Sequence, residues 1–466
     1  MRSLFSGVSG LKAHQTGMDV IGNNIANVNT TGFKSSRTTF ADTLSQTLTG
    51  ASAPGDTVGG TNPKQIGLGT GVASIDLLFT DGSVQSTGKN TDLCLSGNGL
   101  FVLKNGNQTY YTRDGAFEFD SAGNYVLPST GLYVQGWMGE DGSINTSSAA
   151  TNINIPAGKA MASEASKIAT YSNNLDASTP LIESITYTDA AGHTVNAGEV
   201  TIDGTNIKSA IITLTDGTKK KVTSGSYKKG NSIPVTTTVT VYDSLGTAHN
   251  IPVMIKKTAA NIWSATLSNG TNAQNITEDD GSTTNVTLTP GKLIFNEDGT
   301  LNSKASLNGA LQLTFSNGAS AQAVTLDYSA LTQFAGNSTI NAATDGHAAG
   351  TLSSVAADSS GIITGTYTNG VKQVEAQVAI AQFTNASGLT KTGNSLYQAS
   401  NNSGTANVKT ASDLGVTITP SALEMSNVDI ANEFSNMIVT QRGFQSNSKI
   451  ITVGDEMLET LINMKR

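Results

Sequence analysis

The sequence predicts a multidomain protein in which an α-helix at each end of the chain flanks antiparallel all-β middle domains. Apolar residues recur every seven positions near both ends, and the 466 residues exceed the usual single-domain size of about 100–200. Between the ends, short runs of Val, Ile and Leu alternate with Asn-Gly and Asp-Gly dipeptides, which accept the positive φ of tight hairpin turns. We expect the two terminal helices to form a coiled-coil domain.

The first predicted helix lies within residues 1–30 and ends near Asn27. Its apolar seam comprises Leu4, Leu11, Met18 and Ile25 on one heptad position, with Ile21 and Val28 three residues after the last two. Gly7, Gly10, Gly17 and Gly22 each weaken a helix by up to ~1 kcal/mol at an interior position. Both terminal helices are therefore expected to fray in a lone subunit and to become ordered on assembly.

The second predicted helix lies within residues 421–466. Its seam comprises Ile430, Met437, Phe444, Ile451 and Leu458 at intervals of seven, with Phe434 and Ile462 four residues after their neighbours. A sustained 3.5-residue spacing makes a narrow stripe that is typical of a helix with a partner helix. These 13 seam residues are the predicted assembly site. The alternative is an intramolecular antiparallel helix pair that caps one domain.

The middle of the chain is divided by composition and turn signals. Residues 31–70 contain Pro54 and Pro63 and no sustained period, so an extended connector is expected. Residues 71–159 and 346–420 form one β-domain, with turns at Asp81-Gly82 and Asn105-Gly106. Residues 160–345 form an outer β-domain, which is either one domain or two subdomains.

Composition excludes several classes of function. The net charge of −8 argues against a nucleic-acid partner, and the basic run Lys219–Lys221 follows a hairpin turn as a solvated strand face would. Neither stripe offers the ~20 consecutive apolar residues of a membrane span, and no secretory h-region follows Met1. The four histidines have no metal-ligand spacing, and no nucleophile elbow or phosphate loop occurs. We expect no enzyme activity, no catalytic residue, no metal and no cofactor.

The single cysteine, Cys94, excludes an intramolecular disulfide. It alternates with Leu93 and Leu95 in a predicted strand, so a small buried residue is the favoured interpretation. The alternative is a crosslink between subunits, which would require an exposed thiol.

The residues at both ends resemble the bacterial flagellar rod and hook axial protein family. The resemblance rests on Met1–Leu11 and Asp19–Lys34 at the start, and on Glu424–Asp429, Met437–Lys449, Asp455–Leu458 and Leu461–Asn463 at the end. The long β-block, together with Tyr242–His249, Gly388-Leu389 and Gly393–Tyr397, is similar to the hook proteins of that family. Cys94 and Gly443 depart from it, since a small residue such as alanine is expected at position 94 and alanine at position 443.

The resemblance implies a structural subunit of the flagellar hook, a flexible tubular universal joint that transmits torque from rod to filament. Terminal helices would form the inner layer of this homopolymer, with β-domains further out. It also implies an extracellular location, export without a cleaved signal peptide through the flagellar type III apparatus, and three other partners: the distal rod protein, the hook cap protein and the hook–filament junction protein. Two alternatives stay open, a distal rod protein and, less favoured, a secreted β-rich adhesin.

Overall fold

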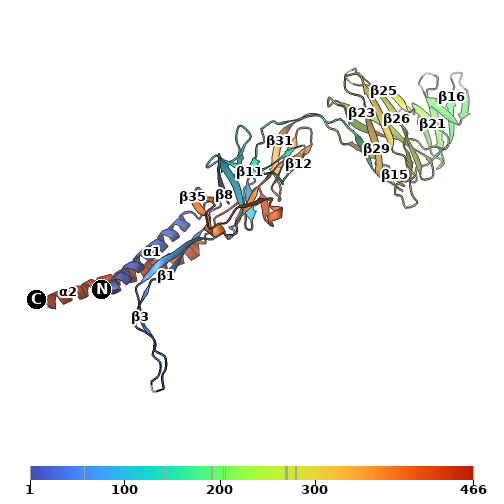
Figure 1. Ribbon diagram of the computed structural model, residues 1–466. Coiled ribbons are helices and arrows are strands. Elements are labelled where there is room, and N and C mark those ends of the chain that lie inside the picture. Colours follow the sequence, from blue (N-terminus) through green and yellow to red (C-terminus); the bar gives the residue numbers. More distant parts are fainter. Residues whose placement is uncertain are drawn as a thin grey trace. The chain divides into compact units, whose positions relative to one another are not determined.

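The computed structural model describes residues 2–464 apart from 57, 141, 190–192, 203, 205, 268–270 and 279–280. It is mostly β-structure with an α-helix towards each end, α1 (Arg2–Ala26) and α2 (Ile430–Met464), as Figure 1 shows. The predicted arrangement of terminal helices around β-domains is confirmed at this level. The chain divides into two compact units, unit 1 (Met1–Lys159, Leu352–Tyr367 and Lys372–Arg466) and unit 2 (Ala160–Thr351 and Thr368–Val371).

Local sequence signals mark the end of α1 and the start of α2. α1 stops directly before Asn27, and Gly32 a few residues later has φ +63°, a conformation that glycine adopts without strain. α2 starts after Asp429, whose carboxylate accepts hydrogen bonds from the backbone N–H groups of Ala431 at 2.9 Å and Asn432 at 3.2 Å. This is an N-cap, which satisfies helix donors that otherwise lack a partner.

The segment expected to be an extended connector, residues 31–70, contains three strands and the first residue of a fourth. These are β1 (Ser36–Asp42), β2 (Ser45–Thr49), β3 (Lys64–Gly67) and β4 (Thr70–Leu77), with β1 antiparallel to β4 and β2 antiparallel to β3. Every residue of β2 and β3 is exposed. A ribbon that buries neither face carries no alternation of apolar and polar residues, which is why the sequence pattern did not reveal it.

The β-part of unit 1 is built from both halves of the chain. Its early strands are β5 (Val84–Ser86), β6 (Leu93–Ser96), β7 (Leu100–Asn105), β8 (Gln108–Thr112), β9 (Glu118–Phe119), β10 (Tyr125–Leu127), β11 (Leu132–Glu140), β12 (Ser143–Ile144) and β13 (Thr151–Asn152). Its late elements are β32 (Ile362–Tyr367), β33 (Lys372–Val378), β34 (Ile380–Gln382), β35 (Thr390–Gly393), β36 (Leu396–Gln398), β37 (Asn407–Lys409), β38 (Thr417–Pro420), β39 (Ala422–Glu424) and the short 3₁₀ turns η1 (Ala386–Gly388) and η2 (Ser412–Leu414). β31 (Gly350–Ala357) runs into this unit from unit 2.

The main sheet of unit 1 interleaves these early and late strands. Its order is β31-β32-β33-β11-β7-β8-β36-β35, while β5 pairs with β39 and β6 with β38. The core beneath it includes Leu93, Phe101, Phe117, Val134 and Val378, each fully buried. Residues from the two ends of the sequence therefore share one core.

Over its described residues, unit 2 contains one six-stranded sheet, two four-stranded sheets and the two-stranded ribbon β18-β21. These elements pack around two hydrophobic cores. Its strands are β14 (Ala160–Met161), β15 (Ile168–Asp176), β16 (Ile182–Thr188), β17 (Thr194–Ala197), β18 (Glu199–Ile202), β19 (Ala210–Leu214), β20 (Lys219–Val222), β21 (Gly225–Lys228), β22 (Val235–Tyr242), β23 (Ala248–Ala259), β24 (Ile262–Leu267), β25 (Ala273–Thr277), β26 (Thr283–Thr289), β27 (Lys292–Ile294), β28 (Gly309–Phe315), β29 (Gln322–Phe334) and β30 (Asn341–Thr344). The order β25-β26-β28-β29-β15-β30 makes one sheet, and β22-β23-β24-β27 makes another. Both contribute to a core that contains Trp263 and Tyr328.

A second core in unit 2 belongs to residues 182–214. It contains Ile182, Ile185, Val200, Ile212 and Leu214, from the sheet β17-β16-β19-β20 and the ribbon β18-β21. Its fully buried residues are separate from the cluster around Trp263. The presence of two separate hydrophobic cores within residues 160–345 favours two subdomains in the outer β-domain.

Candidate assembly site

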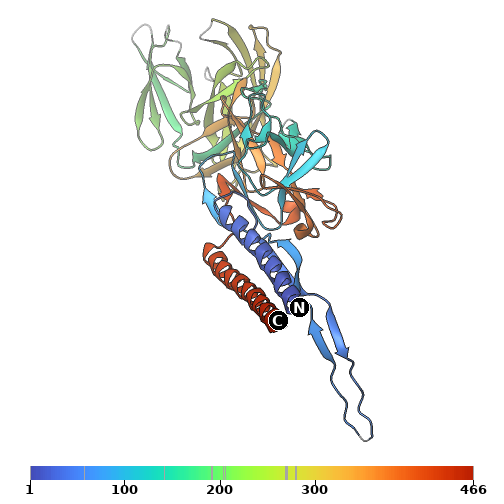
Figure 2. The ribbon, with the colours of Figure 1, turned by 90° about the vertical axis from the view of Figure 1, so that its left-hand side faces the viewer.

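The two terminal helices lie side by side and run antiparallel (Figure 2). Contacts at the glycines give the register: Leu4 meets Gly454, Gly7 meets Ile451, His14 meets Gly443 and Gly17 meets Thr440. Residue numbers fall on α2 as they rise on α1, which defines the antiparallel direction. The contact is intramolecular, as in the alternative that the heptad pattern left open.

Small residues of α1 form the surface that meets α2. A Cβ at Gly10 would lie 2.8 Å from the side-chain amide of Asn447, and a Cβ at Gly443 would lie 2.6 Å from the His14 ring. Gly7, Gly10, Ala13, Gly17 and Ile21 are all buried at helical spacing. Gly7, Gly10 and Gly17, which were expected only to weaken the helix, therefore permit close approach of the two backbones, whereas Gly22 lies outside this contact.

The 13 predicted seam residues are divided among three environments. On α1, Ile21 is buried, while Leu4, Leu11, Met18 and Ile25 are half-buried. Val28, two residues beyond the end of α1, is also half-buried. On α2, Met437, Phe444, Ile451 and Leu458 are half-buried, whereas Ile430, Phe434 and Ile462 are exposed. Most of this apolar stripe thus flanks the glycine-rich contact and remains partly uncovered in one chain.

Sequence reasoning missed a second apolar face on α2. We call this the outer stripe: Ile450, Val453, Met457, Leu461 and Met464, all exposed. Spacings of three and four residues place these side chains on one side of the helix, beside the side that contacts α1. The sequence predictions followed apolar spacing only along the row of α2 that contains Phe444 and Leu458. The same spacing of three and four residues, followed along the neighbouring row, identifies the outer stripe.

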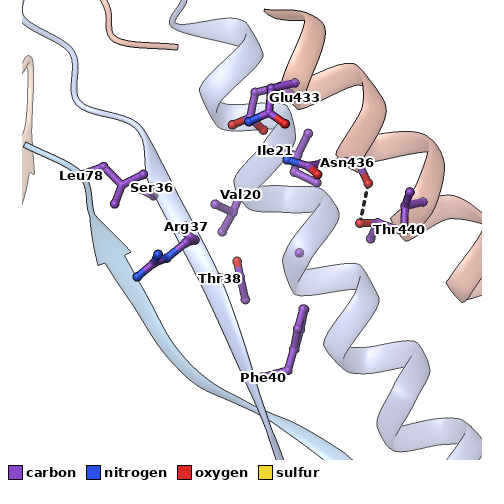
Figure 3. Close-up of a pocket in the computed structure, with 13 residues that line it drawn as sticks. Val20, Ile21, Ser36, Arg37, Thr38, Phe40, Leu78, Glu433, Asn436 and Thr440 are labelled. Atoms are coloured by element: carbon purple, nitrogen blue, oxygen red, sulfur yellow. Dashed lines mark hydrogen bonds between the residues drawn. The ribbon is translucent and has the colours of Figure 1, made fainter. Parts of the chain in front are cut away.

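A groove of about 370 Å³ lies between the helix pair and β1, lined among others by Val20, Arg37, Phe40 and Thr440 (Figure 3). Asn24 connects its three walls, because its side-chain amide donates to the Ser36 carbonyl at 2.8 Å and to Glu433 Oε1 at 3.1 Å. Burial raises the pKa of the Glu433 carboxyl, and the hydrogen bond from Asn24 opposes that shift. These polar contacts fix the position of the helix pair on β1.

Among the described residues, no group of three His, Cys, Asp or Glu side chains is placed to hold a metal ion. His14 packs near Phe40, with ring centroids 6.1 Å apart, and the exposed Lys219–Lys221 run lies in β20. Neither helix, over its described residues, is long and apolar enough to cross a membrane.

Cys94 lies inside the β-part of unit 1. It is fully buried in β6, where it pairs with Thr419 of β38, and burial raises the pKa of its thiol to about 11. A thiolate is the reactive form of cysteine, so this environment disfavours reaction. The position supports the packing interpretation over the crosslink.

Four family models match successive parts of the chain. The model described as "Flagella basal body rod protein" matches residues 4–34, "Flagellar hook protein FlgE/F/G D1 domain" matches 94–169, "Flagellar basal body protein FlaE D2 domain" matches 215–347 and "Flagellar basal body rod FlgEFG protein C-terminal" matches 419–464. The first and last of these cover α1 and α2.

Curated relatives extend over the full chain. The flagellar hook protein FlgE of Treponema pallidum is 39% identical, and that of Borreliella burgdorferi is 37% identical, each with 100% of both chains covered. The flagellar basal-body rod protein FlgG of Bacillus subtilis is 30% identical, again with 100% of both chains covered.

Proposed function

Starting from the fact that this chain belongs to the flagellar hook protein family and is a structural subunit of the hook, we propose that its paired terminal helices form the inner coiled-coil wall of a tubular homopolymer. The half-buried and exposed seam residues and the outer stripe are the proposed contacts between subunits, while the buried Ile21 packs within the chain. The family is structural, so the mechanism is one of binding and mechanics rather than catalysis.

The observation that carries this proposal is the uncovered apolar surface of α2. Met457 and Leu461 in the outer stripe are 60% and 61% exposed. Burial of apolar surface stabilises an assembly by about 25 cal/mol per Å². Contiguous exposed apolar patches on a folded protein typically mark an interaction surface. In a homopolymer, copies of the same chain would cover it.

We assign mechanical roles to the remaining parts. Unit 1 would carry torque along the tube, because strands from both ends of the chain share its sheet and core. Residues 160–345 would form the outer part, with the core of residues 182–214 as a subdomain distinct from the one around Trp263. The ribbon of β2 and β3 belongs to the proposed connector, residues 31–70.

The proposed partners and location follow from the family. We propose an extracellular position in the flagellar hook, reached through the flagellar type III export apparatus without a cleaved signal peptide. The distal rod protein, the hook cap protein and the hook–filament junction protein are the proposed neighbours. The identity to the FlgG rod protein of Bacillus subtilis keeps a rod role as the second candidate, whereas the more similar full-length relatives carry hook names.

The test is polymerisation of the purified chain, followed by sedimentation and electron microscopy. Leu461→Asp places a charge in the outer stripe and should raise the critical concentration for tubes, because an unpaired buried carboxylate is costly. Asn463→Asp is the matched control, since it adds the same charge to the same helical turn at an exposed polar position. Tubes that form equally well from Leu461→Asp, or a wild-type chain that stays monodisperse, would refute the proposal. A rod role predicts straight tubes that do not change curvature.

A further inference from the structure

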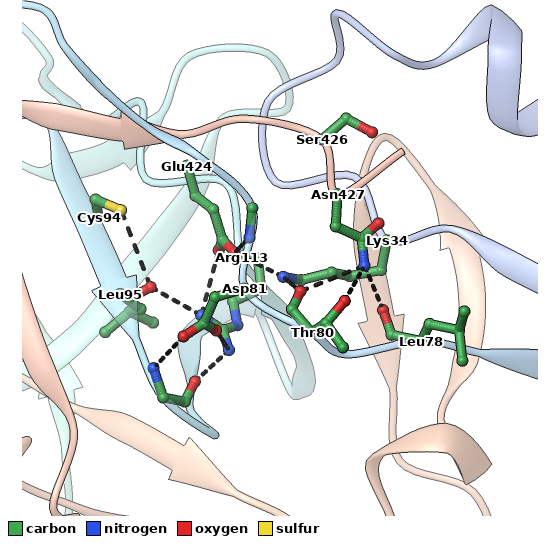
Figure 4. A network of polar contacts seen from close by, with 12 residues as sticks. Lys34, Leu78, Thr80, Asp81, Cys94, Leu95, Arg113, Glu424, Ser426 and Asn427 are labelled. Carbon is green, nitrogen blue, oxygen red and sulfur yellow. Dashed lines mark hydrogen bonds and ion pairs between the residues drawn. The ribbon is translucent and has the colours of Figure 1, made fainter. Parts of the chain in front are cut away.

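Three charged side chains meet inside unit 1 with almost no exposure to solvent (Figure 4). Glu424 accepts from Lys34 Nζ at 2.6 Å through one carboxylate oxygen and from Arg113 Nη1 at 3.2 Å through the other. The side chains of Lys34, Arg113 and Glu424 are 0%, 1% and 1% exposed. We call this group the Glu424 cluster.

The Glu424 cluster lies where both helices join the β-part of the unit. Lys34 is eight residues after the end of α1, and Glu424 is six residues before the start of α2. The Glu424 backbone carbonyl also accepts from the Gly32 N–H at 2.8 Å, and its carboxylate accepts from the Gly82 N–H at 2.8 Å. One residue therefore contacts the N-terminal segment, the loop before β5 and the β-part.

Each cation of the cluster has further partners. Lys34 donates to the Thr80 carbonyl at 2.7 Å, and Arg113 donates to the carbonyls of Leu95 and Gly97. Arg113 also pairs with Asp81 at 3.3 Å, whose carboxylate is 45% exposed. Among the described residues, Glu424 is thus the one fully buried anion that faces these two cations.

The electrostatics couple these three buried charges to one another. Burial lowers the pKa of the Lys34 ammonium, the positive charge of Arg113 lowers it further, and Glu424 opposes both. Removing one partner of a buried ion pair leaves an uncompensated charge, which costs more than the pair contributes. The segments that bring Lys34 and Glu424 together must consequently be ordered at the same time.

Neighbouring polar contacts continue this connection toward the helices. Asn427 accepts from the Ser35 N–H at 2.8 Å and donates to the Leu78 carbonyl at 2.8 Å. Asn24, in the last turns of α1, exchanges hydrogen bonds with the Ser36 backbone and also donates to Glu433 in the first turn of α2. The end of α1 and the start of α2, which we call the roots of the two helices, are therefore joined to one another and to the β-part.

We propose that Glu424 is a positioning residue for assembly, which holds the roots of both terminal helices so that they leave the β-part side by side in a single register. This inference rests on the proposed function, because the register matters only if the helix pair is the polymer-forming element. Pre-arranged roots raise the effective concentration of one helix for the other.

A variant set on the full-length chain tests this. E424Q is close in shape and leaves Lys34 and Arg113 without a buried anion, so the critical concentration for tubes should rise about 100-fold or more. K34M removes one cation and keeps the Glu424–Arg113 pair, so its effect should be smaller. In the double variant K34M/E424Q the unpaired ammonium is gone, and assembly should recover about tenfold or more relative to E424Q.

The matched control is K89M, which breaks the exposed pair of Lys89 and Glu118 in the same unit. Its critical concentration should stay within about twofold of wild type, since exposed pairs contribute little. A double variant that assembles no better than E424Q, or an E424Q chain that assembles like wild type, would overturn the proposal. Failure of the wild-type chain to form tubes would instead refute the proposed function.

A second measurement does not depend on polymerisation. Amide hydrogen exchange at Gly32 and Ser35 should accelerate in E424Q and in K34M, while amides in β7 stay protected and show that the β-part is folded. K34M keeps this readout available if E424Q fails to fold. Unchanged exchange at Gly32 and Ser35 in K34M, with β7 protected, would show that the cluster does not position these segments.

Discussion

Replacement of Gly10 by leucine tests whether close packing of α1 on α2 is required for assembly. A Cβ at Gly10 would lie 2.8 Å from Nδ2 and Oδ1 of Asn447, and this amide donates to the Gly443 carbonyl at 3.0 Å. A leucine would displace the amide or separate the helices. Gly22 offers a matched control on the same helix, because a Cβ there would meet nothing within 4 Å.

The expected magnitude follows from three contributions at Gly10. Overpacking costs about 1–3 kcal/mol, and loss of the Asn447 hydrogen bond costs about 1 kcal/mol. The higher helix propensity of leucine returns about 1 kcal/mol. Gly10→Leu should therefore destabilise the helix pair by about 1–3 kcal/mol, whereas Gly22→Leu should stabilise α1 by about 1 kcal/mol.

The assay compares the critical concentrations of the two variants for tube formation at one pH and ionic strength. A difference of about 2–4 kcal/mol corresponds to a ratio of about 30- to 1000-fold. Amide exchange along α1 in assembled tubes provides an independent readout of helix pairing. Equal critical concentrations, or faster exchange in Gly22→Leu than in Gly10→Leu, would refute the reasoning that the glycine face is the contact surface.

Three further predictions concern other parts of the molecule. Phe444→Asp should abolish sedimenting tubes, because it places a carboxylate in the half-buried seam, while Phe444→Leu should retain them; tubes from Phe444→Asp would contradict the seam assignment. Burial tends to raise the pKa of Asp243, but hydrogen bonds from Asn317, His249 and backbone amides outweigh it and leave the pKa below its ordinary value. The stabilisation of the fold by ionised Asp243 is therefore complete above about pH 4 and is lost as the pH falls through the lower folded-state pKa. In Asn317→Ala, the midpoint of thermal unfolding measured between pH 7 and pH 2 should depend less on acid. An unchanged dependence of that midpoint on pH would count against this. Cys94 should react with a maleimide only after denaturation, and mass analysis under reducing denaturation should give monomer; rapid labelling of the native chain would contradict its burial.

Local signals in the sequence were sufficient for much of the secondary structure. The turn at Asn105-Gly106 joins β7 to β8 with φ +58° at the glycine, and Asp216-Gly217 joins β19 to β20 with φ +82°. The first helix was expected to end near Asn27, and α1 ends at Ala26. Each of these features depends on the conformational preferences of a few adjacent residues.

Only part of the candidate assembly site could be predicted from the sequence. Heptad spacing identified Met437, Phe444, Ile451 and Leu458, which are half-buried on α2, but it did not indicate which surface they face. Gly10 and Gly443 carried no apolar signal, so their role as contact residues could not be recognised. A period shows that a stripe exists, whereas its partner depends on residues more than 400 positions away.

The sequence by itself determined the helix at each end, the β-structure between them and the family, because periodicity, turn chemistry and end motifs are properties of neighbouring residues. Only the tertiary structure decided that β1 to β4 form ladders, that glycines let α1 and α2 approach closely, and that Lys34 and Glu424 share a buried ion pair across 390 positions. Such contacts form only when segments that are distant in the sequence come together in the folded chain. The pairing of each buried charge or small residue then depends on the fold rather than on its neighbours in the chain.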